Sequence, residues 1–250
     1  FGWWKERLPR AVVMQVLDVA TVQAIEEHLP AETRPIVTFS PREILPSAWS
    51  LVTVDGVESI ALAARHLLRA GHRRLGYITR ELSRESNSGE HPLDVQRRMQ
   101  HRRIVRKLND LLRQAGAEAP VSVHGNQYVQ SAGGCDPLAE ENLNRLEDYL
   151  KSPDAPTALI GQDNRMVAAQ RVADVMGITV GEDLSLVGLY NTPWAEAANL
   201  TSVSMREDIV AKRIRELIDA DEQHIQRTVR HVYIQPELVK RNSVIHAAAG

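Results

Sequence analysis

Cysteine, aromatic residues and long apolar runs are all scarce in this 250-residue sequence, and each scarcity excludes a class of protein. The single Cys135 excludes an internal disulfide and a cysteine-cluster metal site, which is consistent with a reducing compartment such as the cytoplasm. No apolar run approaches the length of a membrane-spanning helix, so we do not expect an integral membrane protein. The remaining composition, 43% hydrophobic and 25% charged, is typical of a soluble globular protein.

The sequence also lacks a large excess of basic or of acidic residues. Thirty basic and 32 acidic side chains give a formal net charge of −2, so the chain as a whole does not attract nucleic acid. The run RRMQHRRIVRK (97–107) is most simply a solvated basic helix face, because no aromatic residues are interleaved with it. We find no histidine spacing for metal, no phosphate-binding glycine motif and no nucleophile–base set. We therefore expect no metal, no cofactor and no enzymatic activity.

What the sequence does contain is a regular alternation of short apolar runs with amphipathic helical segments. Apolar runs at 11–16, 36–39, 51–55 and 74–78 alternate with helical patterns such as 19–29 and 59–71. After a polar loop predicted over 80–96, the alternation continues through a helix at 102–116, strands at 121–124, 157–161, 184–188 and 230–236, and helices at 138–152, 164–177 and 208–221. This pattern predicts an α/β fold with parallel sheets, in two lobes or in a competing (β/α)8 barrel.

Four segments occur in an order and spacing that resemble a known family. They are AARHLLRAGHRRLGYI (63–78), PTALIGQDNRMVAAQRVADVMGITVGEDLSLVGLYNTPWAE (156–196), LTSVSM (200–205) and PELVKRNSV (236–244). Together they resemble the effector-binding core of the LacI/GalR family of bacterial transcription regulators. The resemblance implies two Rossmann-like lobes, similar to periplasmic sugar-binding proteins, that bind a small effector between them. It also implies a homodimer, and operator DNA bound through a helix-turn-helix headpiece.

The resemblance also implies where the lobes divide. The first lobe would contain 1–72 and 206–229, and the second 73–205 and 230–250, with three crossings of the hinge. The chain starts without Met, at FGWWKERLPR, which looks like the tail of a helix. We expect that the first strand–helix unit of the core and the headpiece are absent from this sequence.

The stretch DLSLVGLYNTPW (183–194) is the first candidate for a binding site. Its apolar run reads as a strand buried on both faces, and ligands in open α/β sheets bind beyond the carboxyl ends of strands. Tyr190 and Asn191 are therefore predicted to face a ligand, although Asn-Thr-Pro is also an ordinary turn. The resemblance places Tyr190 where the family usually has a sugar-binding Asp.

Further candidates depart from the family pattern in the same way. Asp163 and Asn164 stand in reversed order relative to the usual Asn-Asp; Asp163 is expected either to accept ligand hydroxyls or to cap the following helix. Arg103 is the nearest match to an effector-binding Arg, and Met205 replaces a frequent Gln. Glu58 is also predicted to bind the ligand. His72 is expected to be structural.

The resemblance thus predicts the effector-sensing core of a regulator, a repressor, for a sugar, a sugar derivative or a rarer effector. The alternative is an exported solute-binding protein of a transporter, which would share the two-lobed fold.

Overall fold

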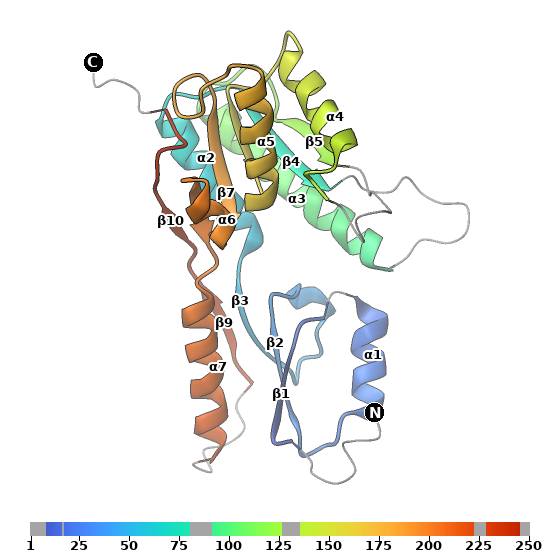
Figure 1. Cartoon of the computed structure of the whole chain (residues 1–250). Coiled ribbons are helices and arrows are strands. Elements are labelled where there is room, and N and C mark those ends of the chain that lie inside the picture. The colour runs from blue at the N-terminus through green and yellow to red at the C-terminus, as the bar shows by residue number, and fades with distance from the viewer. Residues whose placement is uncertain (1–8, 17, 81–91, 127–135, 223–228, 246–250) are drawn as a thin grey trace. The chain divides into compact units, whose positions relative to one another are not determined.

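The computed structural model describes residues 9–16, 18–80, 92–126, 136–222 and 229–245 (Figure 1). It forms two compact units, each with its own sheet. The predicted α/β fold with parallel-sheet lobes is confirmed, and two separate sheets exclude the barrel. Within these ranges, no helix is both long enough and apolar enough to cross a membrane.

The first unit is built on a four-stranded parallel sheet with the order β1-β2-β3-β9. Its elements are β1 (Ala11–Met14), α1 (Val19–His28), β2 (Arg34–Thr38), the 3-10 turn η2 (Arg42–Ile44), β3 (Ser50–Val54), α7 (Glu207–Glu222) and β9 (His231–Ile234). Helix α1 begins after Asp18, whose carboxylate accepts the backbone N–H of Thr21 at 2.8 Å. Val22 of α1 then packs with Val37 and Leu51 of the sheet.

The second unit is built on a six-stranded sheet with the order β10-β8-β7-β6-β4-β5, in which only the β10–β8 pair is antiparallel. Its strands are β4 (Leu75–Arg80), β5 (Ser122–Asn126), β6 (Ala158–Gly161), β7 (Ser185–Tyr190), β8 (Thr201–Ser204) and β10 (Glu237–Val239). Its helices are α2 (Gly56–Arg69), α3 (Pro92–Gln114), α4 (Glu140–Lys151), α5 (Asp163–Val175) and α6 (Pro193–Ala197).

Two hydrophobic cores lie on the opposite faces of this second sheet. Because neighbouring strand residues point to opposite faces, Leu159 and Ile160 of β6 belong to different cores. Ile160 packs with the helices α2 and α3, whereas Leu159 packs with α4, α5 and α6. The strands are therefore buried on both faces, which explains their continuous apolar runs.

The predicted division of the lobes, 1–72 with 206–229 and 73–205 with 230–250, stays a prediction. In the structure the first stretch of the first unit ends at Asp55, and α2 begins the second unit. The reason is packing, because Leu67 and its neighbours on α2 belong to a core of the second sheet. Likewise β9 pairs in parallel with β3, so that 206–235 lies in the first unit and the second resumes at Pro236.

Two helical features were not predicted. Helix α3 begins at Pro92, ten residues before the predicted start at 102, because proline is well suited to the first turn of a helix. Helix α6 forms within the predicted turn, and Pro193 is its first residue. Most of the loop predicted over 80–96, and most of the segment 125–137 with Cys135, lie outside the described residues.

Candidate functional site

The topology of the second sheet points to one place for a binding site. Strands β4 and β6 are neighbours, yet the helix after β4 (α3) lies on one face of the sheet and the helix after β6 (α5) lies on the other. At such a switch point the two connections diverge and leave a crevice beyond the carboxyl ends of the strands. The residues that follow β6, from Gln162 onward, lie at this point.

Asp163 is the centre of a hydrogen-bonded cluster that joins the ends of three strands. Its side chain is buried, and its Oδ1 accepts the hydroxyl of Ser202 at 2.7 Å. Its Oδ2 accepts the backbone N–H of Thr192 at 2.7 Å and the hydroxyl of Thr192 at 2.9 Å. The carboxylate does not cap α5, whose N-cap residue is Gln162. Asp163 therefore fixes the turn after β7, a role that neither sequence alternative described.

The burial of Asp163 has an electrostatic cost. Desolvation raises the pKa of its carboxyl group above the usual value, and this effect exceeds the opposing effects of Ser202, Thr192 and the positive charge of Arg241. A folded-state pKa above the unfolded value means that ionising Asp163 costs free energy of folding. The hydrogen bonds to its two oxygens are what make this charge tolerable.

Gly188 on β7 is required by the position of this carboxylate. A Cβ atom at residue 188 would lie 2.0 Å from Oδ1 of Asp163 and 3.0 Å from Oγ of Ser202. No side chain can occupy that space, so glycine here serves a close approach between β7 and α5. The sequence signal was the glycine that interrupts an otherwise apolar strand.

Tyr190 and Asn191 both adopt left-handed backbone conformations at the end of β7, with φ values of 91° and 50°. Such conformations are strained for residues other than glycine, most of all for a bulky one such as tyrosine. Tyr190 is 39% exposed, and its hydroxyl accepts a hydrogen bond from the Gln162 side chain at 3.4 Å. The strained turn thus presents a phenol at the switch point.

Arg241 reinforces the same turn from the C-terminal segment. Its Nη2 donates to Oδ1 of Asn191 at 2.9 Å, and its Nη1 donates to the carbonyl oxygen of Leu200 at 2.7 Å. The backbone N–H of Asn191 donates to Oγ of Ser202 at 3.0 Å. The side chain and the backbone of Asn191 are thus both bonded within the turn, and its role as a ligand residue stays a prediction.

The first turn of α5 carries the polar groups closest to the switch point. Asn164 has a buried Oδ1 without a hydrogen-bond partner in the described residues. Arg165 is buried and donates from Nη1 to Oε1 of Gln162 at 2.7 Å. Sequence reasoning missed Arg165, Gln162, Ser202, Thr192 and Arg241, because their proximity depends on strand order.

The other predicted ligand residues lie elsewhere in the second unit. Glu58 is on the first turn of α2 and forms an ion pair with Arg65. Met205 is buried, and its sulfur accepts the Ser59 hydroxyl at 3.4 Å. Arg103 is exposed on α3. The hydrogen bonds of the Asp163 side chain go to Thr192 and Ser202 and involve none of these three residues, whose roles as ligand residues stay predictions.

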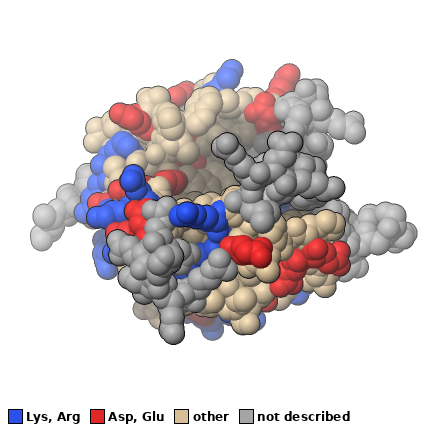
Figure 2. Space-filling model, turned by 90° about the horizontal axis from the view of Figure 1, so that it is seen from below, with Lys and Arg blue, Asp and Glu red and all other residues tan. Residues whose placement is uncertain are grey.

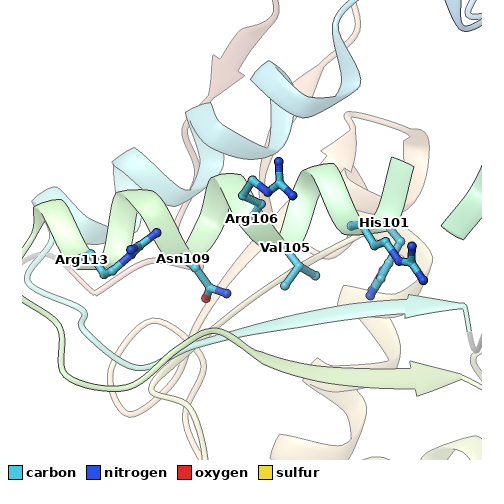
Figure 3. A pocket seen from close by; sticks show the side chains of 6 residues that line it. His101, Val105, Arg106, Asn109 and Arg113 are labelled. Atoms are coloured by element: carbon cyan, nitrogen blue, oxygen red, sulfur yellow. The ribbon is translucent and has the colours of Figure 1, made fainter. Parts of the chain in front are cut away.

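A hollow of about 430 Å³ runs along α3 (Figure 3). It is lined by His101, Arg102, Val105, Arg106, Asn109 and Arg113, and Arg103 is not among them. Oδ1 of Asn109 is already used, since it accepts the backbone N–H of Val121 at 2.8 Å. On the molecular face shown in Figure 2, basic and acidic side chains occur together, as the near-neutral net charge suggests.

His72 has structural contacts. It is buried, and its ring nitrogens lie 2.9 Å from Oγ1 of Thr157 and 2.8 Å from Oγ of Ser185. Burial lowers the pKa of the imidazole, which favours the neutral ring between two hydroxyl partners. Among the described residues, no group of three or more His, Cys, Asp or Glu side chains is arranged to bind a metal ion.

Comparison with known proteins places this geometry in a family. Residues 64–244 match the model of the periplasmic binding protein-like domain. The chain is 27% identical over 213 residues to the HTH-type transcriptional repressor PurR of Klebsiella pneumoniae, a match covering 84% of this chain and 56% of the relative. A Shigella sonnei PurR is 25% identical over the same extent. The chain thus spans about half the length of these curated relatives.

Solved structures show the same fold. A LacI-family regulator from Rhizobium etli, described as putative, has a TM-score of 0.73 at 16% identity, covering 98% of this chain and 81% of that one. A Rhodococcus LacI transcriptional regulator has a TM-score of 0.69 at 19% identity, with 98% and 81% coverage. An Enterococcus faecium LacI-family regulator with bound ribose has a TM-score of 0.69 at 18% identity, with 96% and 81% coverage. The chain belongs to the periplasmic binding protein-like domain family.

Proposed function

We propose that this chain is the effector-sensing and dimerisation core of a bacterial DNA-binding transcriptional regulator, a repressor. The observation that carries the proposal is the turn after β7 at the switch point. There Asp163 fixes a strained backbone that presents Tyr190, within the segment that matches the family. A small molecule that contacts this edge would favour one arrangement of the two units over another.

The proposed partners follow from this mechanism. The effector is a sugar or sugar derivative in the first instance, a class supported by the ribose in the Enterococcus faecium regulator. The chain forms a homodimer, and operator DNA is bound through a helix-turn-helix headpiece. Effector and operator affinities are then coupled reciprocally. A dimer of headpieces also requires an operator with near-palindromic half-sites. The protein acts in the cytoplasm, where the DNA is.

The exported solute-binding protein is the weaker alternative, because the similar curated proteins are repressors. An enzyme is also disfavoured on the same ground. We propose that the chain binds its small molecule without turnover. Recovery of the bound molecule unchanged after prolonged incubation is the corresponding check.

The experiment is a thermal-shift screen of this chain against sugars, sugar phosphates, sugar acids and nucleobases. A ligand at 100 times its Kd stabilises the folded state by about 2.7 kcal/mol, which is readily seen in a melt. The variant that tests the proposed binding site is Tyr190→Ala. The matched control is Tyr233→Ala, which removes an exposed tyrosine of β9 in the first unit.

Loss of the shift in Tyr190→Ala, with retention in Tyr233→Ala, would support an effector site at the end of β7. A hit that both variants bind equally well would place the site elsewhere. If no compound shifts the melt, the sensing function itself is contradicted. Sedimentation of the chain at micromolar concentration tests the dimer separately.

A further inference from the structure

Arg165 is a buried cation without an acidic partner in the described part of the chain. Its side chain is 8% exposed, its Nη1 is bound to the neutral Gln162, and its buried Nε has no hydrogen-bond partner among the described residues. A guanidinium group stays charged at any physiological pH. A buried charge without compensation is strongly unfavourable, so its presence calls for a partner that the described residues do not supply.

The nearest carboxylate in sequence, Asp163, does not provide that compensation. Both of its oxygens are occupied by Ser202 and Thr192, and the cation that acts on it electrostatically is Arg241. Arg241 in turn is bound to the turn after β7. Among the described residues, the hydrogen bonds of Asp163 thus go to Ser202 and Thr192, and no ion pair with an acidic side chain is found for Arg165.

Arg165 lies next to polar side chains that follow two neighbouring strands. It donates to Gln162, and the amide nitrogen of Gln162 donates to the Tyr190 hydroxyl at 3.4 Å. Gln162 and Arg165 follow the end of β6, and Tyr190 is the last residue of β7, so these groups come from the carboxyl ends of two strands at the switch point. The N-cap residue of α5, Gln162, makes no side-chain capping bond, so the positive end of the helix dipole reinforces the charge of Arg165.

We propose that the effector carries an anionic group, a carboxylate or a phosphate, that pairs with Arg165. This inference rests on the proposed function and narrows its effector class from neutral sugars to acidic or phosphorylated ones. The planar guanidinium can donate to two oxygens of either anion, and the amide Nε2 of Gln162, which donates to the Tyr190 hydroxyl in this structure, can donate to the ligand instead.

The test uses matched pairs of compounds that differ only in the anionic group: glucose with glucuronate and with glucose 6-phosphate, and ribose with ribose 5-phosphate. Inorganic phosphate alone is the minimal probe. The variant is Arg165→Met, and the matched control is Arg171→Met, an exposed arginine on the same helix. Arg165→Lys retains a charge without the planar fork and serves if the Met variant folds poorly.

We expect the acidic or phosphorylated member of a pair to shift the melt while its neutral partner does not. Arg165→Met should weaken binding about thirtyfold or more, because it leaves the ligand's charge unpaired, and Arg171→Met should leave it unchanged. In the absence of ligand, Arg165→Met should melt no lower than the unchanged chain, because an unpaired buried charge has been removed.

Three outcomes would overturn this inference. Neutral sugars that bind as tightly as their acidic partners would leave the proposed function intact but refute the anionic effector. An anion that binds Arg165→Met unchanged, and whose shift is instead lost in Arg106→Met, would place the anion in the hollow along α3. Strong destabilisation of Arg165→Met without ligand, with unchanged anion binding by Arg165→Lys, would make Arg165 a purely structural cation. A screen in which no compound binds refutes the proposed function as well.

Discussion

Replacing Asp163 by alanine should destabilise the second unit far more than replacing it by asparagine. The carboxylate accepts three hydrogen bonds, at 2.7, 2.7 and 2.9 Å, and bonds to a charged group contribute about 1.5–3 kcal/mol each. The desolvation that raises the pKa of Asp163 offsets part of this sum. Alanine would recover the desolvation cost but leave the Thr192 N–H and the Ser202 hydroxyl without their acceptor. We expect a net loss of about 2–4 kcal/mol for Asp163→Ala.

Asparagine at position 163 has nearly the same shape as aspartate and can form most of the same hydrogen bonds. Its amide oxygen can accept the Thr192 N–H while its amide nitrogen donates to Ser202, so Asp163→Asn should cost about 1 kcal/mol or less. The assay is urea unfolding at pH 7 followed by circular dichroism, with midpoints compared at equal m-values. Equal losses for the two variants, or a loss below about 1 kcal/mol for alanine, would refute the assignment of Asp163 as the organiser of the turn.

A double-mutant cycle with Gly188 tests the same geometry from the other side. In Gly188→Ala the new Cβ would lie 2.0 Å from the Asp163 carboxylate, so the strand or the carboxylate must move. Overpacking of this kind typically costs about 1–3 kcal/mol. In the Asp163→Ala background the obstructing oxygen is gone, and the cost of Gly188→Ala should fall by about 1 kcal/mol or more. Additive losses would mean that the close contact is not the reason for the glycine.

Three other measurements test separate parts of the structure. Burial lowers the pKa of His72 and His101, so below the unfolded-state pKa of 6.5 the unfolded chain binds more protons than the folded chain, and stability should fall as the pH decreases. Urea midpoints measured as a function of pH should show this fall, and the fall should be smaller in His72→Asn. Tyr190→Gly should leave the free energy of unfolding unchanged or raise it by up to about 1 kcal/mol, since glycine tolerates φ of 91°, while effector binding is lost; a clear destabilisation would argue against backbone strain at this residue. Leu67→Ala should cost about 2–5 kcal/mol, because the side chain is fully buried between α2 and the second sheet; a loss below 1 kcal/mol would contradict that packing.

The alternation of apolar runs and amphipathic helices by itself determined the α/β fold. Strand positions such as 157–161 and 184–188 could be predicted because a strand buried on both faces needs a short continuous apolar run. Periodicity did not predict the start of α3 at Pro92, because that part of the helix is highly polar. It also did not assign α2 to the second unit, since an apolar helix face does not specify which sheet it covers.

The candidate site depended on tertiary structure to a greater degree. Tyr190 and Asn191 could be picked out from the sequence because they directly follow a buried strand. The cluster of Asp163, Thr192 and Ser202 could not, since these residues are up to 39 positions apart and meet only through the order of β6, β7 and β8. The uncompensated charge of Arg165 is likewise a tertiary property. The sequence shows which residues are charged, but only the folded structure determines which of them are buried and which acidic side chains already have hydrogen-bond partners.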